Sequence, residues 1–530
     1  MKKIGDLLFV WLGGLVIVCL AAIFQFSPGY MDAEYYFAGG KLIWQGNAFR
    51  EPFLWNYLAD PKSLPAPAFT YWMPLASVIA WLGMTLGNDV NFQIARVPFL
   101  ILSSFIPPLT YALSWQISGK RFTALFAALM AWLPVFFLAY LTTTDTFAIY
   151  MILGSVWFVL AGKIPELSKG RCFLGGIISG LMHLARADGL FWMLMFFAKL
   201  IIDGITKRRQ QEKDFPLGAV ILFLLGYLVV MGGWYGRNWM EFQSLFPPGN
   251  QRALFIRTYN DLFRYPPGEL NFTYFLKDGL APLINDRLFA IGQNIQTLIA
   301  VQTEILLFPL FLLGIWKKRS EPIVRMGSVA WLVMFGLMSV VFPFAGWRGG
   351  YFHVAAAFQP LVWCLASEGL GIFVNWGVRK RDWKATQALQ VFSVFILFFL
   401  LILTVYIYRV RVIGDNPSRP IWEESQKRQA QICHALREVI TGEEIREEAI
   451  MINNPIGFYL ACEQMAVSVP VGGERAIRMV AQQFGVRFLV LESDHPPELA
   501  DHFSAPRNTG LLTLIDNQPE WKIYRIHEIP

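Results

Sequence analysis

Long blocks of apolar residues recur along most of this chain, and they constrain its fold more than any other feature. Of the 530 residues, 55% are hydrophobic and only 16% are charged, whereas an average soluble domain carries about 25% charged residues. A helix of about 20 apolar residues is long enough to cross the roughly 30 Å hydrocarbon core of a bilayer. The sequence therefore predicts a polytopic α-helical membrane protein.

We distinguish eleven apolar segments along the chain, and the fifth and sixth of them form a short hairpin. The expected spans lie near residues 7–26, 92–113, 122–141, 147–161, 173–184, 190–205, 217–235, 297–316, 329–344, 352–373 and 389–408. The first segment could instead be a cleaved signal peptide, but it lacks the small-x-small cleavage site that such a peptide carries. We expect it to remain as an uncleaved span.

Basic residues mark one side of the expected membrane domain. With the N-terminus in the cytosol, every cytosolic segment contains at least two basic residues, whereas the short outer turns contain one or none, as the positive-inside rule requires. The cytosolic set includes Lys2, Lys3, Lys120, Arg121, Lys163, Lys169, Arg171, Lys207, Arg208, Arg209, Lys213, Lys317, Lys318, Arg319, Arg325, Arg379, Lys380, Arg381 and Lys384. An odd number of spans then places the C-terminal segment outside the plasma membrane.

The C-terminal segment differs from the rest in composition. From Arg411 onward it has 12 Lys and Arg against 17 Asp and Glu, a net charge of −5, so the preceding part carries +12. This distribution argues against nucleic-acid binding. We expect helices at 423–441 and 474–484 and strands at 449–452, 488–491 and 521–526, which together form a small α/β domain. The spacing of Cys433 and Cys462 leaves open whether they form a disulfide.

The predicted organisation therefore has two domains. Residues 1–410 form a transmembrane domain with two outer loops, 27–91 and 236–296, and residues 411–530 form an extracytoplasmic α/β domain. Because loop 27–91 is rich in aromatic residues and proline, we expect it to contain amphipathic helices that lie at the membrane interface.

Ionisable residues recur at the outer ends of the spans, where a charge is costly next to lipid and is a functional candidate by default. They are Asp32, Glu34, Asp145, Arg186, Asp188, Arg237 and Arg348. Both signs are present, so they can converge on one anionic, hydroxyl-bearing ligand. The alternatives are structural: an ion pair between Arg186 and Asp188, a helix N-cap at Asp145, lipid headgroup contacts at the arginines, and a packing role for His353.

Four short motifs stand at successive outer turns. They are Met31-Asp32-Ala33-Glu34-Tyr35-Tyr36-Phe37-Ala38-Gly39-Gly40, His183-Leu184-Ala185-Arg186-Ala187-Asp188-Gly189, Gly233-Trp234-Tyr235-Gly236-Arg237-Asn238, and the segment from Arg348 to Pro360. In this order they resemble motifs of the GT-C glycosyltransferases, and in particular the bacterial branch related to protein mannosyltransferases and lipid A aminoarabinose transferases. Two departures are Gly233, where that branch has proline, and the spacing after Arg348.

This resemblance implies an inverting transfer of a sugar from a polyprenyl-phosphate donor to an acceptor at the outer face. Asp32 would be the base that takes the acceptor's proton, and Glu34 would position the acceptor or help to hold a metal. The donor phosphate would be bound by Arg237, Arg348 and Lys41. Other residues expected near the site are Tyr35, Tyr36, Tyr71, Trp72, Asp145, Arg186, Asp188 and His353. The sequence leaves open the metal, the sugar and the acceptor.

The main alternative function is a transporter or flippase for a lipid-linked or amphipathic anion. Transporters place ionisable groups near the middle of the membrane, often in broken helices. Here these groups cluster at one face, and a long outer loop follows the first span, which favours an enzyme. A third hypothesis is a non-catalytic scaffold whose outer tail binds partners in the cell envelope.

Overall fold

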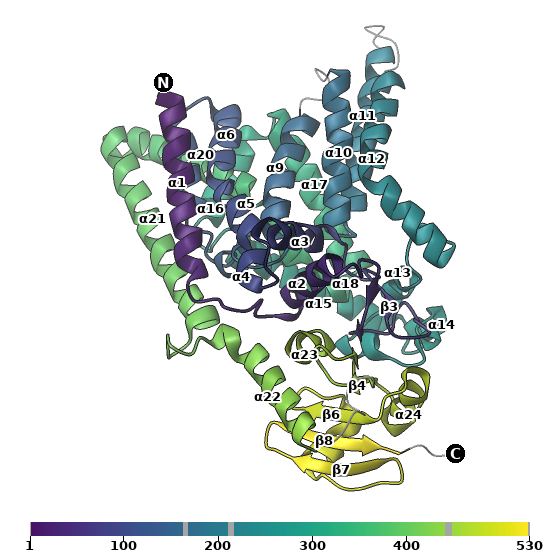
Figure 1. The fold of residues 1–530 in the computed structure, drawn as a ribbon. Helices are drawn as coiled ribbons and strands as arrows, with labels where there is room; N and C mark the ends of the chain where they lie inside the picture. Colours follow the sequence, from purple (N-terminus) through teal and green to yellow (C-terminus); the bar gives the residue numbers. More distant parts are fainter. Residues whose placement is uncertain (1, 163–167, 210–216, 440–447, 528–530) are drawn as a thin grey trace. The chain divides into compact units, whose positions relative to one another are not determined.

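A computed structural model describes residues 2–162, 168–209, 217–439 and 448–527 of the chain (Figure 1). It divides into two compact units, each built from three separate stretches of sequence. The first unit comprises Met1–Gln25, Arg96–Gly236 and Arg287–Pro420, and the second comprises Phe26–Ala95, Arg237–Asp286 and Ile421–Pro530. The expected basic residues Lys163 and Lys213, and residues 440–441 of the expected tail helix, lie outside the described residues.

The first unit is helical. Its helices are α1 (Lys2–Ala22), α5 (Val97–Ser104), α6 (Ile106–Ser118), α7 (Arg121–Met130), α8 (Leu138–Leu141), α9 (Phe147–Gly162), α10 (Lys169–Ala185), α11 (Gly189–Arg209), α16 (Phe308–Lys318), α17 (Pro322–Gly336), α18 (Pro343–Ala345), α19 (Tyr351–Ala356), α20 (Gln359–Arg381) and α21 (Ala385–Tyr408). Short π-helical segments occupy Thr297–Gln302, Leu337–Val341, Gly346–Gly350 and Arg409–Ile413. Helices α12 (Leu217–Phe242) and α15 (Leu280–Gln296) contribute residues to both units.

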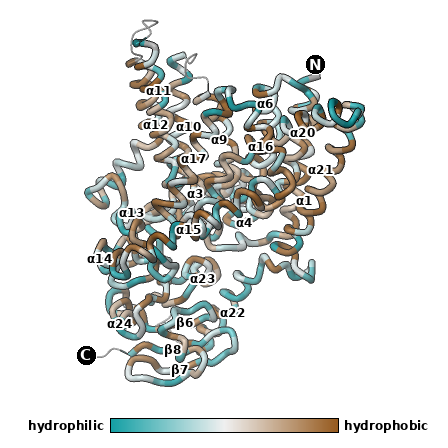
Figure 2. The backbone as a smooth tube through the Cα atoms, turned by 180° about the vertical axis from the view of Figure 1, so that it is seen from behind, coloured by the Kyte–Doolittle hydropathy of each residue, from teal (hydrophilic) through white to brown (hydrophobic). Residues whose placement is uncertain are grey.

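Seven helices within the described ranges are long and apolar enough to cross a membrane. They are Lys3–Ala22, Phe92–Ser118, Gly189–Thr206, Leu217–Phe242, Pro322–Val341, Gln359–Arg381 and Ala385–Ile413. Figure 2 shows that α1 and α21 are hydrophobic along most of their length. Each predicted span contains helix, but the third is interrupted between α7 and α8 and the eighth before α16. The number of eleven spans therefore stays a prediction.

Glycine allows the helices of the first unit to approach closely. A β-carbon on Gly314 of α16 would lie 2.0 Å from the carbonyl oxygen of Leu365 in α20, and one on Gly369 of α20 would lie 1.9 Å from that of Leu310. Small residues at such contacts allow the backbones of two apolar helices to pack directly against each other. The α16–α20 pair therefore depends on glycine at both positions.

The second unit contains a mixed sheet. Within the described part of the chain it has six strands in the order β2 (Phe53–Leu54), β5 (Ala466–Val467), β4 (Ile450–Met451), β6 (Phe488–Glu492), β8 (Trp521–Ile526) and β7 (Leu512–Asn517). The pairs from β2 to β6 are parallel, and β8 pairs antiparallel with both β6 and β7. A separate antiparallel pair joins β1 (Arg50–Glu51) to β3 (Ala66–Pro67).

The second unit also contains helices. They are α2 (Met31–Trp44), α3 (Leu75–Gly87), α4 (Phe92–Ala95), α13 (Gly249–Arg252), α14 (Phe272–Leu276), α22 (Glu424–Val439), α23 (Pro455–Cys462), α24 (Gly473–Phe484) and α25 (Ala500–Ser504), with 3-10 turns at Ala253–Phe255, Tyr259–Phe263, Pro267–Glu269, Ile421–Glu423 and Pro497–Leu499. All five residues of β6 are buried, which is the pattern of a strand covered on both faces. One face packs against Ile477 and Val480 of α24, and the other against Ile432 and Leu436 of α22.

The tail elements expected from the sequence coincide with α22, α24, β4, β6 and β8, whereas β2, β5, β7 and α23 were not expected. The grouping of the loops also differs from the predicted division, because the outer loops belong to the same unit as the tail. The backbone shows why. Ala466 donates a hydrogen bond to Pro52 O (3.1 Å) and Ser468 donates one to Leu54 O (2.7 Å), so β2 of the first loop forms an edge of the tail's sheet.

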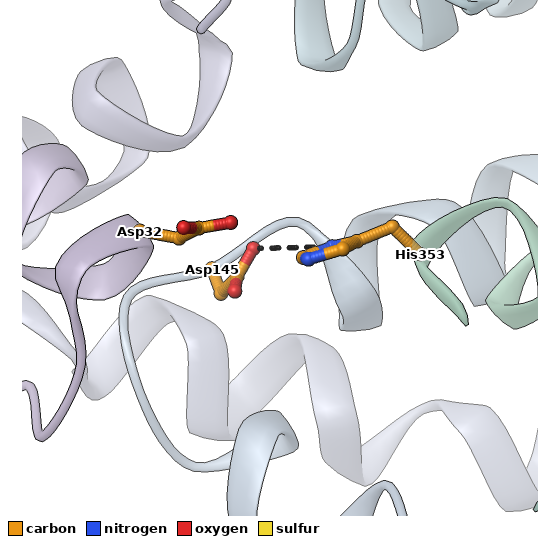
Figure 3. A group of neighbouring side chains, drawn as sticks. All are labelled: Asp32, Asp145 and His353. Carbon is orange, nitrogen blue, oxygen red and sulfur yellow. Dashed lines mark ion pairs between the residues drawn. The ribbon is translucent and has the colours of Figure 1, made fainter. Parts of the chain in front are cut away.

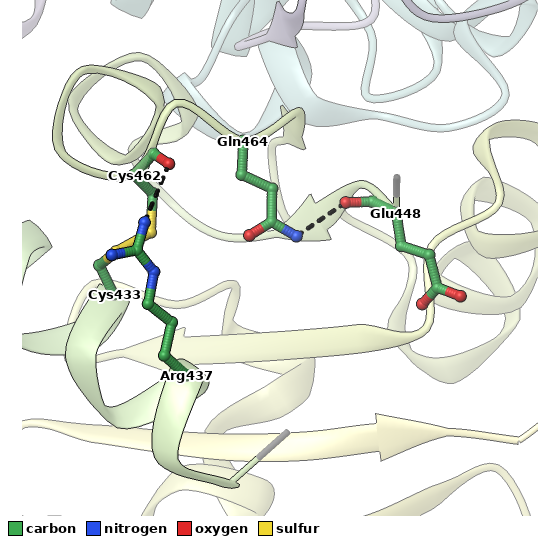
Figure 4. The surroundings of a disulfide bond; sticks show 5 residues. All are labelled: Cys433, Arg437, Glu448, Cys462 and Gln464. Carbon is green, nitrogen blue, oxygen red and sulfur yellow. Dashed lines mark hydrogen bonds between the residues drawn. A yellow bond between two sulfur atoms is a disulfide. The ribbon is translucent and has the colours of Figure 1, made fainter. Parts of the chain in front are cut away.

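A disulfide joins Cys433 of α22 to Cys462 at the end of α23, with their Cα atoms 5.8 Å apart (Figure 4). Nearby, Arg437 donates a hydrogen bond to Cys462 O at 3.4 Å. The bond links two helices that pack on the same side of the sheet as part of one hydrophobic cluster. It answers the question that the spacing of these cysteines left open.

Candidate functional site

In the first unit, Asp145 and His353 form a buried acid–imidazole pair (Figure 3). Asp145 lies in the bend between α8 and α9, and its Oδ1 is 3.8 Å from His353 Nδ1. It also accepts hydrogen bonds from the backbone N–H and hydroxyl of Thr146. His353 comes from α19 and stacks on Phe147, with ring centroids 4.2 Å apart. The sequence analysis listed Asp145 and His353 as individual residues expected near the site, and the structure shows that they form a pair.

This pair has the chemistry of metal ligands. A carboxylate oxygen and an imidazole nitrogen are both groups that bind divalent transition metals. The Asp145 side chain is fully buried and that of His353 is 11% exposed, so neither is a freely solvated surface group. These two described residues of the first unit could together contribute two ligands to a divalent cation.

Arg186 and Asp188 form an ion pair, as the structural alternative supposed. Arg186 Nε lies 2.8 Å from Asp188 Oδ1, and the other carboxylate oxygen accepts a hydrogen bond from the Tyr150 hydroxyl at 2.9 Å. The Arg186 guanidinium also lies 5.8 Å from the centre of the Tyr150 ring. The pair connects the turn between α10 and α11 to α9.

In the second unit, α2 carries five of the residues that the resemblance implies, beginning with Asp32 in its first turn. A carboxylate there is favoured by the partial positive charge at the start of a helix. Asp32 is partly exposed, whereas Glu34, two residues later and on another face, is 2% exposed. The two acids therefore occupy different environments although they are neighbours in sequence.

Glu34 is held by the C-terminal segment. Its Oε2 accepts a hydrogen bond from Asn454 Nδ2 (2.8 Å) and its Oε1 accepts one from the Ser425 hydroxyl (3.4 Å). Burial raises the pKa of this carboxyl group, and the hydrogen bond from Asn454 opposes that shift. In this structure Glu34 attaches α2 to α22 and to the start of α23.

Tyr35 lies at the centre of an aromatic cluster formed by the first loop. Its hydroxyl donates to Glu51 Oε2 at 2.9 Å and accepts from the backbone N–H of Phe69 at 2.9 Å. Its ring lies 4.7 Å from that of Trp72, and Trp72 stacks on Trp55 at 4.4 Å. Tyr71 packs edge-on to the same tryptophans. Tyr36 is 1% exposed, so Tyr35 and Tyr36 are parts of the core of the loop.

The three basic residues expected at the donor phosphate lie in different settings. Lys41 forms an ion pair with Glu463 at 2.6 Å. Arg237 is buried and donates to Ala68 O at 2.7 Å. Arg348 is exposed and lies in the π-helical turn five residues before His353. Lys41 and Arg237 both make their contacts within the second unit.

The second unit also has a pocket of about 360 Å³ that the sequence did not indicate. Met31, which precedes Asp32, lines it together with residues of the tail, among them Gln429, Asn453 and Glu492. Burial and the nearby Asp494 raise the pKa of Glu492 to about 7. The tail residues lie about 400 positions after α2, and no motif marks them, so sequence reasoning had no signal with which to find them.

Comparison with known proteins gives similarity in structure and none in sequence. No family model and no curated protein matches this sequence. The fold is similar to that of ArnT from Cupriavidus metallidurans in the apo state, at a TM-score of 0.56 and 12% identity over 99% of this chain and 98% of ArnT. ArnT bound to undecaprenyl phosphate matches at 0.53 and 12% identity, with 98% of each chain covered.

An archaeal protein has a similar fold. The oligosaccharyltransferase AglB from Archaeoglobus fulgidus, in complex with an inhibitory peptide and a dolichol-phosphate, matches at a TM-score of 0.53 and 11% identity, over 93% of this chain and 69% of AglB. At these identities the comparisons establish the fold alone. This chain has the membrane fold of the GT-C glycosyltransferases.

Proposed function

We propose that this protein is a membrane glycosyltransferase that moves a sugar from a polyprenyl-phosphate donor to an acceptor at the outer face of the membrane. The similarity to ArnT over almost the whole of both chains is the observation that carries this proposal. The ArnT and AglB structures were obtained with undecaprenyl phosphate and dolichol-phosphate, which supports a lipid phosphate as the donor's carrier. The distribution of basic residues supports the outer face.

The proposed reaction is a single displacement with inversion at the anomeric carbon. An acceptor hydroxyl oxygen attacks this carbon while its bond to the phosphate oxygen breaks, and the bonding electrons leave with the polyprenyl phosphate. Asp32 takes the proton of the attacking hydroxyl, a role that typically contributes 10²–10⁴-fold to the rate. Its partly exposed position at the start of α2 supports this assignment, whereas the buried and hydrogen-bonded Glu34 is better suited to positioning α2.

Basic residues would stabilise the negative charge that develops on the departing phosphate. Arg348 is the strongest candidate of the three because it is exposed. Lys41 and Arg237 would bind phosphate only by exchanging their contacts with Glu463 and the Ala68 carbonyl. A divalent cation, where the enzyme uses one, would supply further positive charge, and Asp145 and His353 are the residues to hold it.

Replacement of Asp32 tests this proposal at the residue that would do the chemistry. The Asp32→Asn variant should lose transfer by at least about 100-fold while its thermal unfolding stays unchanged. Asp89→Asn is the matched control, because Asp89 is an exposed carboxylate in the same loop. Sugar transfer by Asp32→Asn at the wild-type rate would remove Asp32 as the base.

A further inference from the structure

The pocket of the second unit is walled by three elements of the tail and by the start of α2. Arg428 and Gln429 come from α22, Asn453 precedes α23, and Glu492 ends β6. Its volume of about 360 Å³ falls in the range of small-molecule sites, which is roughly 300–1,000 Å³. Tyr259 and Phe263 add an aromatic wall, with their rings 5.1 Å apart.

Three buried oxygen atoms of the lining have no hydrogen-bond partner among the described residues. They are Oε1 of Glu492, Oε1 of Gln429 and Oδ1 of Asn453. Glu492 and Gln429 are 3% and 2% exposed. A buried polar atom without a partner is destabilising because it has lost its hydration, and most buried polar groups in proteins are paired. A cluster of three in one pocket therefore indicates a ligand.

The hydrogen bonds within the pocket show which amide atoms remain as acceptors. The amide nitrogen of Gln429 donates to Glu492 Oε2 at 3.4 Å, and that of Asn453 donates to Asp494 Oδ1 at 2.6 Å. Because both amide nitrogens are engaged with carboxylates, both amide oxygens remain as acceptors. The pocket thus offers several acceptors close together, and its ligand has to be a donor of several hydrogen bonds.

We propose that this pocket binds a carbohydrate through its hydroxyl groups, and that this carbohydrate is the acceptor. Neighbouring hydroxyls on a sugar ring can donate to Glu492, Gln429 and Asn453, and an aromatic wall suits the apolar face of the ring. Arg428, with its Nη1 4.0 Å from Glu492 Oε2, supplies a donor for a sugar oxygen. Among the described residues, the acidic groups of the pocket form no cluster of three that would suit a cation instead.

The assignment as acceptor rests on the proposed function. Met31 lines the pocket and Asp32 is the next residue of α2. The pocket therefore adjoins the first turn of α2, which also carries the residue proposed to take the acceptor's proton. The pocket would then select the acceptor, while the donor's lipid phosphate would be bound elsewhere.

Direct binding tests this inference without a donor. The full-length protein in lipid nanodiscs is titrated at pH 8 with methyl glycosides of hexoses, pentoses and N-acetylhexosamines, and binding is measured by saturation-transfer difference NMR. We expect at least one glycoside to bind, and the Glu492→Ala variant to bind it at least about tenfold more weakly. Glu492→Gln, which keeps the shape of the side chain, should lose less. Glu498→Ala is the control, because Glu498 is an exposed acid outside the pocket.

Three outcomes would overturn the inference. They are binding that Glu492→Ala does not weaken, absence of binding by every glycoside, and an increase in thermal stability with CaCl₂ that Glu492→Ala removes while no glycoside competes. Thermal unfolding of each variant excludes loss of fold as the cause. Donor turnover is measured on the same wild-type sample. Glycoside binding without donor turnover would support the glycoside pocket and contradict the proposed function. Donor turnover without glycoside binding would support the proposed function and contradict the glycoside pocket.

Discussion

Two neighbouring acids illustrate how far function can be assigned to single residues. Asp32 and Glu34 look alike in sequence, but Asp32 is partly exposed while Glu34 is buried against Asn454 and Ser425. Burial of a carboxylate is tolerated only when hydrogen bonds compensate for lost hydration. Glu34 therefore has the environment of a residue that holds two segments together, whereas Asp32 is the more accessible of the two acids.

Replacement of Glu34 should reveal this structural role. The Glu34→Ala variant leaves the donors of Asn454 and Ser425 without their acceptor, so we expect a loss of about 1–3 kcal/mol in the stability of the second unit. Thermal unfolding of the purified protein measures it. Glu34→Gln keeps an oxygen for Asn454 and should lose much less. Equal stability of the Ala variant and the wild type would show that these hydrogen bonds contribute little.

Glu51 should make the stability of the second unit depend on pH. Burial raises the pKa of this carboxyl group to about 8 from a usual 4.5. Between pH 4.5 and pH 8 the folded state therefore binds more protons than the unfolded state. The stability that the protonated Glu51 contributes below pH 4.5 is lost as the pH rises through 8. Relative to Glu51→Gln, the wild type should lose on the order of 3 kcal/mol between pH 5 and pH 8.

Thermal unfolding of both proteins across this pH range measures the difference. Glu492, whose burial raises its pKa to about 7, is present in both proteins and cancels in the comparison. Parallel pH profiles for the wild type and Glu51→Gln would mean that Glu51 titrates at its usual pKa and is accessible to water.

At the scale of elements, the disulfide makes a direct prediction. Cys433 and Cys462 are 29 residues apart, and closing a loop of this length stabilises a fold by roughly 3–4 kcal/mol. We expect the free energy of unfolding of the double Ser variant to be lower by this amount, so the variant should unfold at a lower temperature. In the wild type, maleimide should label neither cysteine until a reductant is added.

Cys19 provides the control, because it is a free and exposed cysteine of the first unit. Cys19→Ser should leave the unfolding temperature unchanged. Labelling of Cys433 and Cys462 in the absence of a reductant would show that the two residues do not pair in the protein as purified.

The elements also show where sequence reasoning succeeds. The strands β4, β6 and β8 were predicted because each coincides with a run of apolar residues between turn signals. The two-residue strands β2 and β5 carry no such pattern, because their pairing depends on backbone contacts between residues about 400 positions apart. The membership of β2 in the tail's sheet was therefore not predictable from local sequence.

At the scale of the molecule, the apolar blocks predicted the membrane fold because the length of a span is set by the thickness of the bilayer. The pairing of Asp145 with His353 depends on how helices pack, so the sequence named both residues without pairing them. The ion pair between Arg186 and Asp188 is local, two positions apart in one turn, and it was among the alternatives that the sequence offered. The number of spans was the least secure part, since short helices such as α7 and α8 interrupt an apolar segment without a change in composition.

Donor turnover is the measurement that shows whether the protein consumes a lipid-linked sugar. The purified protein in lipid is supplied with a panel of polyprenyl-phosphate sugars that carry a labelled sugar, in parallel with Asp32→Asn. We expect one donor to be consumed, polyprenyl phosphate to appear, and both signals to disappear in the variant. Intact donors that cross the bilayer of proteoliposomes at equal rates in both proteins would contradict the proposed transfer reaction and indicate a transporter.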